Sequence, residues 1–280
     1  MMTQINFKTK NLFKYMVMVF VCAIFFSPFV YLISTALKDQ NQIITAPRTM
    51  FPLPLHFENF RTVMQNYPMG RYFANTFTVV LFAIIGNIIV STLTGYALAR
   101  MVFKGRELLF NLTLACMFMP LFLIIIPRFL IFKSLGMIGT LLPLILPSAF
   151  GSPFCIFLMR QFLRGIPMSL SEAARIDGCS EFRIYSQIIM PLSGPALATI
   201  IIFTTQWRWN EFIEPLIYLQ SEKLYTITMG LYTFIWMAAE EINTHLVMTF
   251  VILTVLPILM IFVVAQKWFV EGISSSGIKN

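Results

Sequence analysis

The sequence contains few charged residues. Asp, Glu, Lys and Arg make up 11% of its 280 residues and hydrophobic residues make up 58%, whereas a soluble domain carries about 25% charged residues. This composition excludes an ordinary soluble domain. The net charge is +8, but the 20 basic residues are scattered between apolar runs. A nucleic-acid-binding surface needs clustered Lys and Arg, so we expect no nucleic-acid partner.

The sequence also lacks the common patterns of catalytic and metal-binding sites. We find no GxxxxGK[ST] phosphate loop, HExxH or GxSxG motif, and neither His56 nor His245 has a partner at metal or catalytic spacing. The cysteines form no CxxC pair, and we expect them to be small core residues: Cys22, Cys116, Cys155 and Cys179. We therefore predict that this chain is not an enzyme and holds no metal or cofactor.

What the sequence does contain is long apolar runs. Six runs without a charged residue each reach 20 residues or more, the length that spans a bilayer: 15–37, 72–99, 108–127, 134–159, 184–207 and 242–266. These runs predict an all-α polytopic membrane protein with six transmembrane helices. The first run could be a signal peptide, but its 23 residues exceed the usual apolar region of about 7–15, which favours a retained anchor.

The division of the chain follows from these runs. We expect a cytoplasmic N-terminus over residues 1–14, a transmembrane domain over 15–269 and a cytoplasmic C-terminal tail over 270–280. With both termini inside, the cytoplasmic segments hold twelve of the 20 basic residues, in agreement with the positive-inside rule.

Two features of the runs concern helix packing. Ser91, Gly95 and Ala99 place small side chains on one helical face, a pattern typical of close helix contact. Prolines occur within several runs, which either indicates kinked helices around a transport pathway or reflects the general frequency of proline in membrane helices.

A polar segment over residues 160–195 interrupts the runs on the cytoplasmic side. Ser169 and Glu172 have the spacing of a capping box, and Gly178 stands where a left-handed turn ends a helix. We therefore predict a short helix over 170–177, followed by a second helix that begins at Ser180 and ends at Pro191. The alternative is an amphipathic surface loop.

The same segment resembles a known signature. Glu172-Ala173-Ala174, then Gly178 and, nine residues later, Ile188-Ile189-Met190-Pro191 is similar to the EAA motif of permease subunits in ATP-binding-cassette importers, with Met190 where leucine is usual. Further segments resemble the carbohydrate-uptake branch, in particular the shorter permease of maltose-type systems. They include Tyr96-Ala97-Leu98-Ala99-Arg100, Trp209-Asn210-Glu211-Phe212 and Phe269-Val270-Glu271-Gly272.

The resemblance implies a type I importer permease (MetI-like) fold in the cytoplasmic membrane of a prokaryote. It implies a sugar or oligosaccharide substrate and three kinds of protein partner: a second permease, expected to be a different chain, an ATPase dimer that carries ATP and Mg, and an external solute-binding protein. It also implies that Glu172, Ala173, Ala174 and Gly178 couple the permease to the ATPase, that an external loop over residues 220–243 contacts the binding protein, and that the tail from Gly272 reaches toward the ATPase.

Charged residues cluster near the end of the fifth run. Arg208, Glu211 and Glu214 fall at three-residue spacing and are therefore expected on one helical face, with Trp209 and Asn210 beside them. One interpretation is an interfacial belt with an Arg208 to Glu211 salt bridge. The other is that Asn210 and Glu211 line the outward pathway, with Trp209 as a stacking platform for a sugar ring.

Two other classes of function fit the sequence less well. An ion-driven secondary transporter is expected to bury ionisable residues within the membrane, whereas the six runs contain no Asp, Glu, Lys or Arg. A membrane-embedded enzyme needs a nucleophile with a base, or paired acids, and the sequence provides no such pair. The ATP-driven importer is the favoured prediction.

Overall fold

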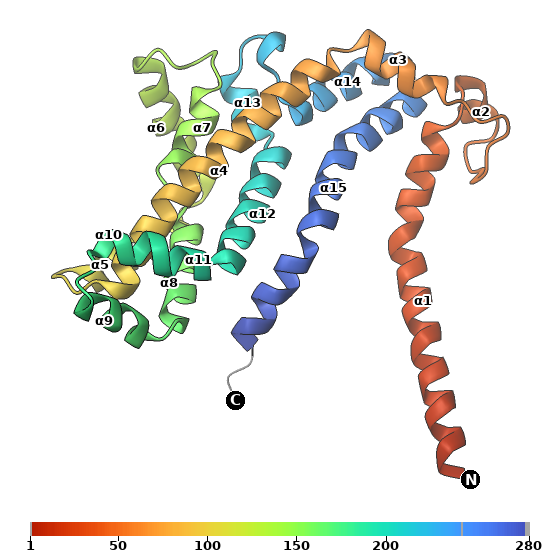
Figure 1. The fold of residues 1–280 in the computed structure, drawn as a ribbon. Coiled ribbons are helices and arrows are strands. Elements are labelled where there is room, and N and C mark those ends of the chain that lie inside the picture. Colours follow the sequence, from red (N-terminus) through yellow and green to blue (C-terminus); the bar gives the residue numbers. More distant parts are fainter. Residues whose placement is uncertain (1, 242, 278–280) are drawn as a thin grey trace. The chain divides into compact units, whose positions relative to one another are not determined.

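Helices are the only regular secondary structure in the residues that the computed structural model describes, which are 2–241 and 243–277 (Figure 1). Side chains are described for 12, 14–238 and 243–263. Four helical segments are long and apolar enough to cross a membrane: Lys14–Ala36, Met69–Arg100, Leu142–Gly165 and Thr244–Val263. Two further segments pass the same test as bent pairs, Arg106–Met117 with Leu121–Ser134 and Glu181–Leu192 with Gly194–Asn210. The six predicted crossings are obtained when each bent pair is one span.

The chain divides into two compact units, and the first comprises Met1–Pro68 and Leu231–Leu256. It contains α1 (Met2–Ala36), α2 (Gln40–Thr45), α3 (Glu58–Asn66) and parts of α14 (Ile227–Glu241) and α15 (Thr244–Gly277). Asn59 of α3 donates hydrogen bonds to the carbonyls of Ala36 and Lys38, both at 2.8 Å. These bonds satisfy carbonyls at and just beyond the C-terminal end of α1, which have no partner within that helix.

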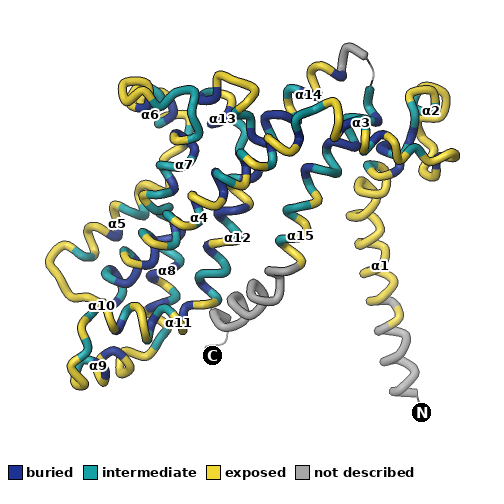
Figure 2. The backbone as a smooth tube through the Cα atoms, turned by 45° about the horizontal axis from the view of Figure 1, so that its top comes forward, coloured by how far each residue is buried: buried dark blue, intermediate teal, exposed yellow. Residues whose placement is uncertain are grey.

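The second unit comprises Met69–Gly230 and Pro257–Asn280. Its centre is α4 (Met69–Arg100), which packs against α7 (Leu142–Ala149), α8 (Pro153–Gly165) and α12 (Gly194–Asn210). In Figure 2 the buried residues gather on these helices. In the first unit, α1 is exposed over residues 14–31 and is buried only at its end, at residues 34–36.

The small residues of α4 allow this packing. Ser91 and Gly95 are buried, and a Cβ on Gly95 would lie 2.8 Å from the Cβ of Met159 in α8. Ala99 packs against the hydrophobic core cluster that contains Met159. The predicted close helix contact is therefore confirmed, and it joins α4 to α8.

The two bent pairs have proline at or beside their breaks. α5 (Arg106–Met117) and α6 (Leu121–Ser134) meet at 100°, with Pro120 in an extended conformation just before α6. Glu181–Leu192 consists of α10 (Glu181–Arg183), η1 (Ile184–Ile189) and α11 (Met190–Leu192), and it meets α12 at 77°. Pro191 has no N–H to donate, and the preceding Met190 N–H bonds five residues back to Tyr185, as in a π-helix. The second predicted helix therefore ends one residue beyond Pro191.

Some predicted boundaries were wrong. The fourth span is Leu142–Gly165 instead of 134–159, because glycines 136 and 139 adopt positive φ before it begins. The segment 220–243, expected to be a loop, is mostly helix: η2 (Glu222–Leu224) and all of α14 lie within it. The backbone of α15 continues to Gly277, and the side chains of the predicted tail lie outside the described residues.

The cysteines differ in their environment. Cys155 is buried, as predicted, and Cys179 is half-buried. Cys22 and Cys116 are exposed on this chain, so the prediction of core residues was wrong for these two. Both lie on apolar helices, α1 and α5, whose outer faces are free to meet lipid or another chain.

Candidate functional site

The short helix predicted for the polar segment 160–195 is α9 (Met168–Ile176), which begins two residues earlier than predicted. The capping box was wrong: Ser169 lies inside the first turn, and the residue before the helix is Pro167, which makes no side-chain cap. Pro167 has an extended conformation. Proline suits the start of a helix because the first amides have no intrahelical acceptor, so its missing N–H is not lost from the helix.

The other end of α9 forms the predicted left-handed cap. Gly178 has a φ of +80°, which glycine adopts without steric cost. The N–H of Cys179 donates to the Ala174 carbonyl at 2.9 Å and that of Gly178 donates to Arg175 at 3.0 Å, the pair of bonds of a Schellman motif. The Ser180 side chain then accepts from the N–H of Arg183 and begins the next helix, as predicted.

The four residues predicted to couple to an ATPase lie together on this helix and its cap. Glu172, Ala173 and Gly178 are exposed, whereas Ala174 is buried in a core cluster formed with α4, α8 and η1. Large apolar side chains are exposed beside them: Leu170 at 42%, Ile176 at 86% and Phe182 at 71%. The surface of α9 therefore combines small side chains with apolar area, the composition expected of a contact with another protein.

Arg100, at the last residue of α4, holds the N-terminal end of α9 in place. Its guanidinium is buried and donates to the carbonyls of Leu163 at 2.8 Å and Ile166 at 2.6 Å, at the end of α8. It also reaches Pro167 and Ser171 of α9 at 3.3 and 3.4 Å. This role of Arg100 was not predicted from the sequence. The available signal was a single arginine directly after a long apolar run.

Tyr96, one turn earlier on α4, is linked to the other end of α9 through Glu181 of α10. Its hydroxyl donates to Glu181 at 2.7 Å, and the second carboxylate oxygen of Glu181 accepts from Arg175 at 2.6 Å. The hydrogen bond to Glu181 raises the pKa of Arg175 above its ordinary value. These partners were missed because they come from three separate helices.

A second charged cluster lies among α6, α7, α12 and α13 (Ile213–Tyr218). The buried carboxylate of Glu214 pairs with Arg128 and, at 2.8 Å, with Arg208. Arg208 also donates to Ser148 at 2.9 Å. The predicted Arg208 to Glu211 salt bridge was wrong, because the backbone is extended at Glu211 and the three charges no longer share one helical face.

The three residues predicted to line the pathway differ in exposure. Trp209 is 1% exposed and packs edge-on against Phe77, so its ring presents no open face for a sugar in this structure. Asn210 is exposed and its amide donates to the carbonyl of Gln206. Glu211 is half-buried and accepts from the N–H of Glu214.

A buried polar group lies in the middle of α4, where the sequence showed only an apolar run. The Asn87 amide donates to Thr204 of α12 at 2.9 Å, and its oxygen accepts from Ser91 at 2.9 Å and from the N–H of Ser152 at 2.7 Å. These bonds satisfy the amide without water, as a polar group in a membrane interior requires.

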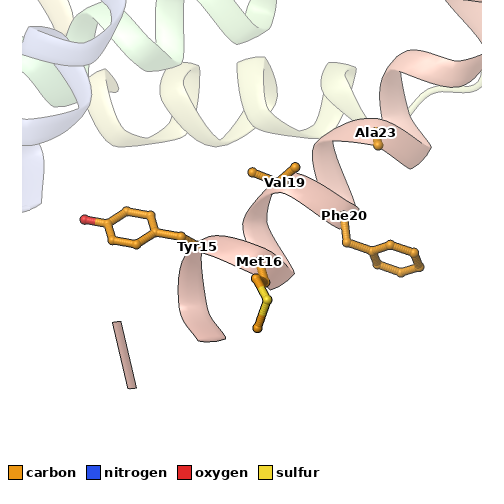
Figure 3. Close-up of a pocket in the computed structure, with 5 residues that line it drawn as sticks. All are labelled: Tyr15, Met16, Val19, Phe20 and Ala23. Atoms are coloured by element: carbon orange, nitrogen blue, oxygen red, sulfur yellow. The ribbon is translucent and has the colours of Figure 1, made fainter. Parts of the chain in front are cut away.

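The described residues contain no group of three or more His, Cys, Asp or Glu that could hold a metal. A shallow apolar pocket lies on α1, lined by Tyr15, Met16, Val19, Phe20 and Ala23 (Figure 3). All five side chains come from one helix, so the pocket is a feature of an open surface rather than an enclosed site.

Comparison with known proteins identifies the family of this chain. The sequence model of the family described as binding-protein-dependent transport system inner membrane component matches residues 88–275. The chain belongs to this family. It is therefore a multi-pass inner membrane permease, a transport subunit that works with a binding protein and an ATPase. The matched region includes α9 and the C-terminal part of α4, from residue 88 onward.

Individual relatives extend over almost the whole permease. The melibiose/raffinose/stachyose import permease protein MelC of Bacillus subtilis is 31% identical over 275 residues, 98% of each chain. The arabinooligosaccharides transport system permease protein AraQ of Halalkalibacterium halodurans is 30% identical over 264 residues, 93% of this chain and 94% of its own.

A solved structure shares the fold of the permease. It is the crystal structure of a bacterial ABC transporter involved in the import of the acidic polysaccharide alginate, with a TM-score of 0.82 at 22% identity. The match covers 94% of this chain and 97% of the other. The predicted all-α importer permease fold is thereby confirmed.

Proposed function

We propose that this permease carries a sugar or oligosaccharide across the cytoplasmic membrane and that α9 couples its movement to ATP hydrolysis on a partner. The observation that carries the proposal is the build of α9: its ends are fixed by Arg100 and by the Gly178 cap, and its outer surface is apolar. A helix held in this way can pass on a rigid-body displacement. The names of MelC and AraQ support the substrate class.

The complete importer in this proposal has four kinds of protein. A second, different permease completes the pathway, two ATPase subunits bind ATP and Mg, and an external binding protein delivers the sugar to residues 220–243. Both termini of this chain are cytoplasmic. The exposed α1 meets lipid or the second permease, because its apolar side chains, such as Phe20 and Phe25, are 67% and 70% exposed on this chain and cannot remain in water.

Reconstitution tests this function directly. The permease is coexpressed with its neighbouring transport genes, purified, and placed in proteoliposomes with ATP on the ATPase side and radiolabelled oligosaccharides with the binding protein on the other. We expect a stable complex with the ATPase and uptake that requires both ATP and binding protein. Uptake by the chain alone, driven by a proton or sodium gradient, would support the ion-driven alternative and overturn the proposal.

The coupling surface is tested by enlarging Ala173, which is exposed on α9. Ala173→Leu adds bulk where a partner approaches closely, so we expect less ATPase to copurify and uptake to fall. The matched control is Ala74→Leu at the opposite end of α4, also an exposed helical alanine. Equal recovery of ATPase with both variants would count against α9 as the docking helix.

The pathway residues are a separate part of the proposal. We place Asn210 and Glu211 on the route of the sugar, and Trp209 joins them if its ring turns out of its packing against Phe77. Glu211→Ala is expected to lower the rate of uptake and to raise the sugar concentration at which uptake is half-maximal. Unchanged uptake and affinity in Glu211→Ala would remove this assignment without affecting the role of α9.

A further inference from the structure

We propose that α4 is the mechanical link between the external segment Glu222–Ile227 and the coupling helix α9, and that polar side chains at its two ends are the positioning residues for this link. The inner contacts are Tyr96 and Arg100, and the outer contacts are Tyr72, Asn75 and Thr76. The inference rests on the proposed function, because it assumes that α9 meets an ATPase and that residues 220–243 meet the binding protein.

The outer contacts attach α4 to the segment that precedes α14. Asn75 donates to the carbonyls of Lys223 and Tyr225, both at 3.0 Å. The N–H of Ile227 donates to the hydroxyl of Thr76 at 2.8 Å, and the Tyr72 hydroxyl donates to Glu222 at 2.8 Å. Three side chains within two turns of one helix therefore bind the backbone and a carboxylate of the external segment.

The inner contacts attach the other end of α4 to α9 at two points. Arg100 donates to Pro167 and Ser171, at the N-terminal end of α9. Tyr96 reaches Arg175, at its C-terminal end, through the carboxylate of Glu181. Two attachments at opposite ends of a nine-residue helix, which is about 13 Å long, prevent it from pivoting about either one.

The helix between these contacts is continuous. α4 runs for 32 residues without proline, which corresponds to about 48 Å, longer than the hydrocarbon core of about 30 Å. Its middle is tied to α8 and α12 by Asn87 and by the close approach at Gly95. A displacement of the external segment can therefore reach α9 through one continuous element.

The experiment compares variants that remove one hydrogen-bonding group from each end of α4. Tyr96→Phe deletes only the hydroxyl, so that its edge-on contact with Tyr185 remains. Asn75→Asp keeps the shape but loses the amide that donates to the two carbonyls. The matched control is Thr78→Val, which deletes a hydroxyl that donates to Ala74 of α4 itself.

Each variant is reconstituted as the whole importer, with the wild-type binding protein and the sugar that the wild-type complex transports. We measure the stimulation of ATP hydrolysis by binding protein and the sugar taken up per ATP. For Tyr96→Phe we expect both quantities to fall about fivefold, the factor expected from one lost hydrogen bond, with the same amount of ATPase in the complex. Asn75→Asp loses two hydrogen bonds, so we expect a fall at least as large. Thr78→Val is expected to match the wild type.

Two outcomes overturn the link. In the first, the two variants keep wild-type stimulation and uptake per ATP. In the second, the losses only follow a lower yield of assembled complex, which would assign these contacts to folding alone. Arg100→Lys and Arg100→Met distinguish a role in coupling from a role in folding. Lysine keeps the positive charge, so Arg100→Lys should retain part of the coupling that Arg100→Met loses. A wild-type complex without ATP-dependent uptake would instead refute the proposed function, so the two failures are distinguishable.

Discussion

Arg160 of α8 binds both carboxylate oxygens of Glu107 of α5 through one guanidinium nitrogen, at 2.8 and 2.9 Å. The same guanidinium donates to the carbonyl of Leu98 at 3.1 Å, and its central carbon lies 3.6 Å from the centre of the Phe110 ring. Arg160 is buried, whereas the side chain of Glu107 is 58% exposed. The pair therefore joins α4, α5 and α8 through one arginine.

We expect the two partners of this pair to contribute unequally. Arg160→Ala removes the bond to Leu98 and the contact with Phe110 as well as the ion pair, and should cost about 3 kcal/mol of unfolding free energy. Glu107→Ala removes a partner that is largely in water and should cost much less than Arg160→Ala. Thermal unfolding of the two purified variants measures the difference. Equal losses for both would contradict this unequal assignment.

The carboxylate of Glu214 is expected to be the critical member of its cluster. Glu214→Gln leaves Arg128 and Arg208 facing each other without a counter-charge, and loss of one partner of a buried ion pair costs about 3–5 kcal/mol. The side chains of the two arginines are 19% and 17% exposed. Water partly screens their charges, so we expect a cost near the lower end of this range. Arg128→Gln and Arg208→Gln should each be milder, because Glu214 keeps one cation.

The melting temperature of the assembled importer orders these three variants. Glu214→Gln should have the lowest value. If Arg208→Gln were equally damaging, its bond to Ser148 would be the more important contact.

Gly95 and Gly70 provide a matched pair on α4. A Cβ at Gly95 would lie 2.8 Å from the Cβ of Met159 and 3.2 Å from the backbone nitrogen of Arg160, whereas a Cβ at Gly70 would meet nothing within 4 Å. Gly95→Ala should therefore destabilise the contact of α4 with α8 by about 1–3 kcal/mol. Gly70→Ala should stabilise slightly, by up to about 1 kcal/mol, because alanine favours the helix. Unfolding of both variants in the same detergent compares the two, and a neutral Gly95→Ala would show that the helices can move apart freely.

Lys38 holds the connection between α2 and α3 from inside the first unit. Its ammonium is buried and donates to the carbonyls of Pro47 at 2.8 Å and Ala46 at 3.3 Å. Lys38→Met should lose about 1.5–3 kcal/mol from the stronger of these charge-assisted bonds and expose Arg48 to trypsin more often. Cleavage at Arg48 is followed by mass spectrometry in detergent. The control is Lys133→Met, an exposed lysine of α6, and equal cleavage rates for both variants would show that Lys38 does not hold this segment.

Two errors in the sequence prediction share one cause. Ser169 and Glu172 have the spacing of a capping box, but Pro167 begins α9 earlier, and Arg100 of a distant helix contacts its first turn. Arg208 has an acid three residues later, but a break in the helix gives it Glu214 instead. In both cases the spacing is present in the sequence, but a side chain of another helix makes the contact instead.

The sequence by itself determined the properties that depend on composition and on near neighbours. Hydrophobic length predicts the crossings because each must satisfy its own backbone in lipid, and Gly178 predicts the end of α9 because few residues adopt positive φ without strain. The tertiary structure alone decided which polar side chains meet. Tyr96 contacts Glu181 across 85 positions and Asn75 contacts Lys223 across 148, and such partners follow from the packing of helices against one another, which spacing within one helix cannot specify.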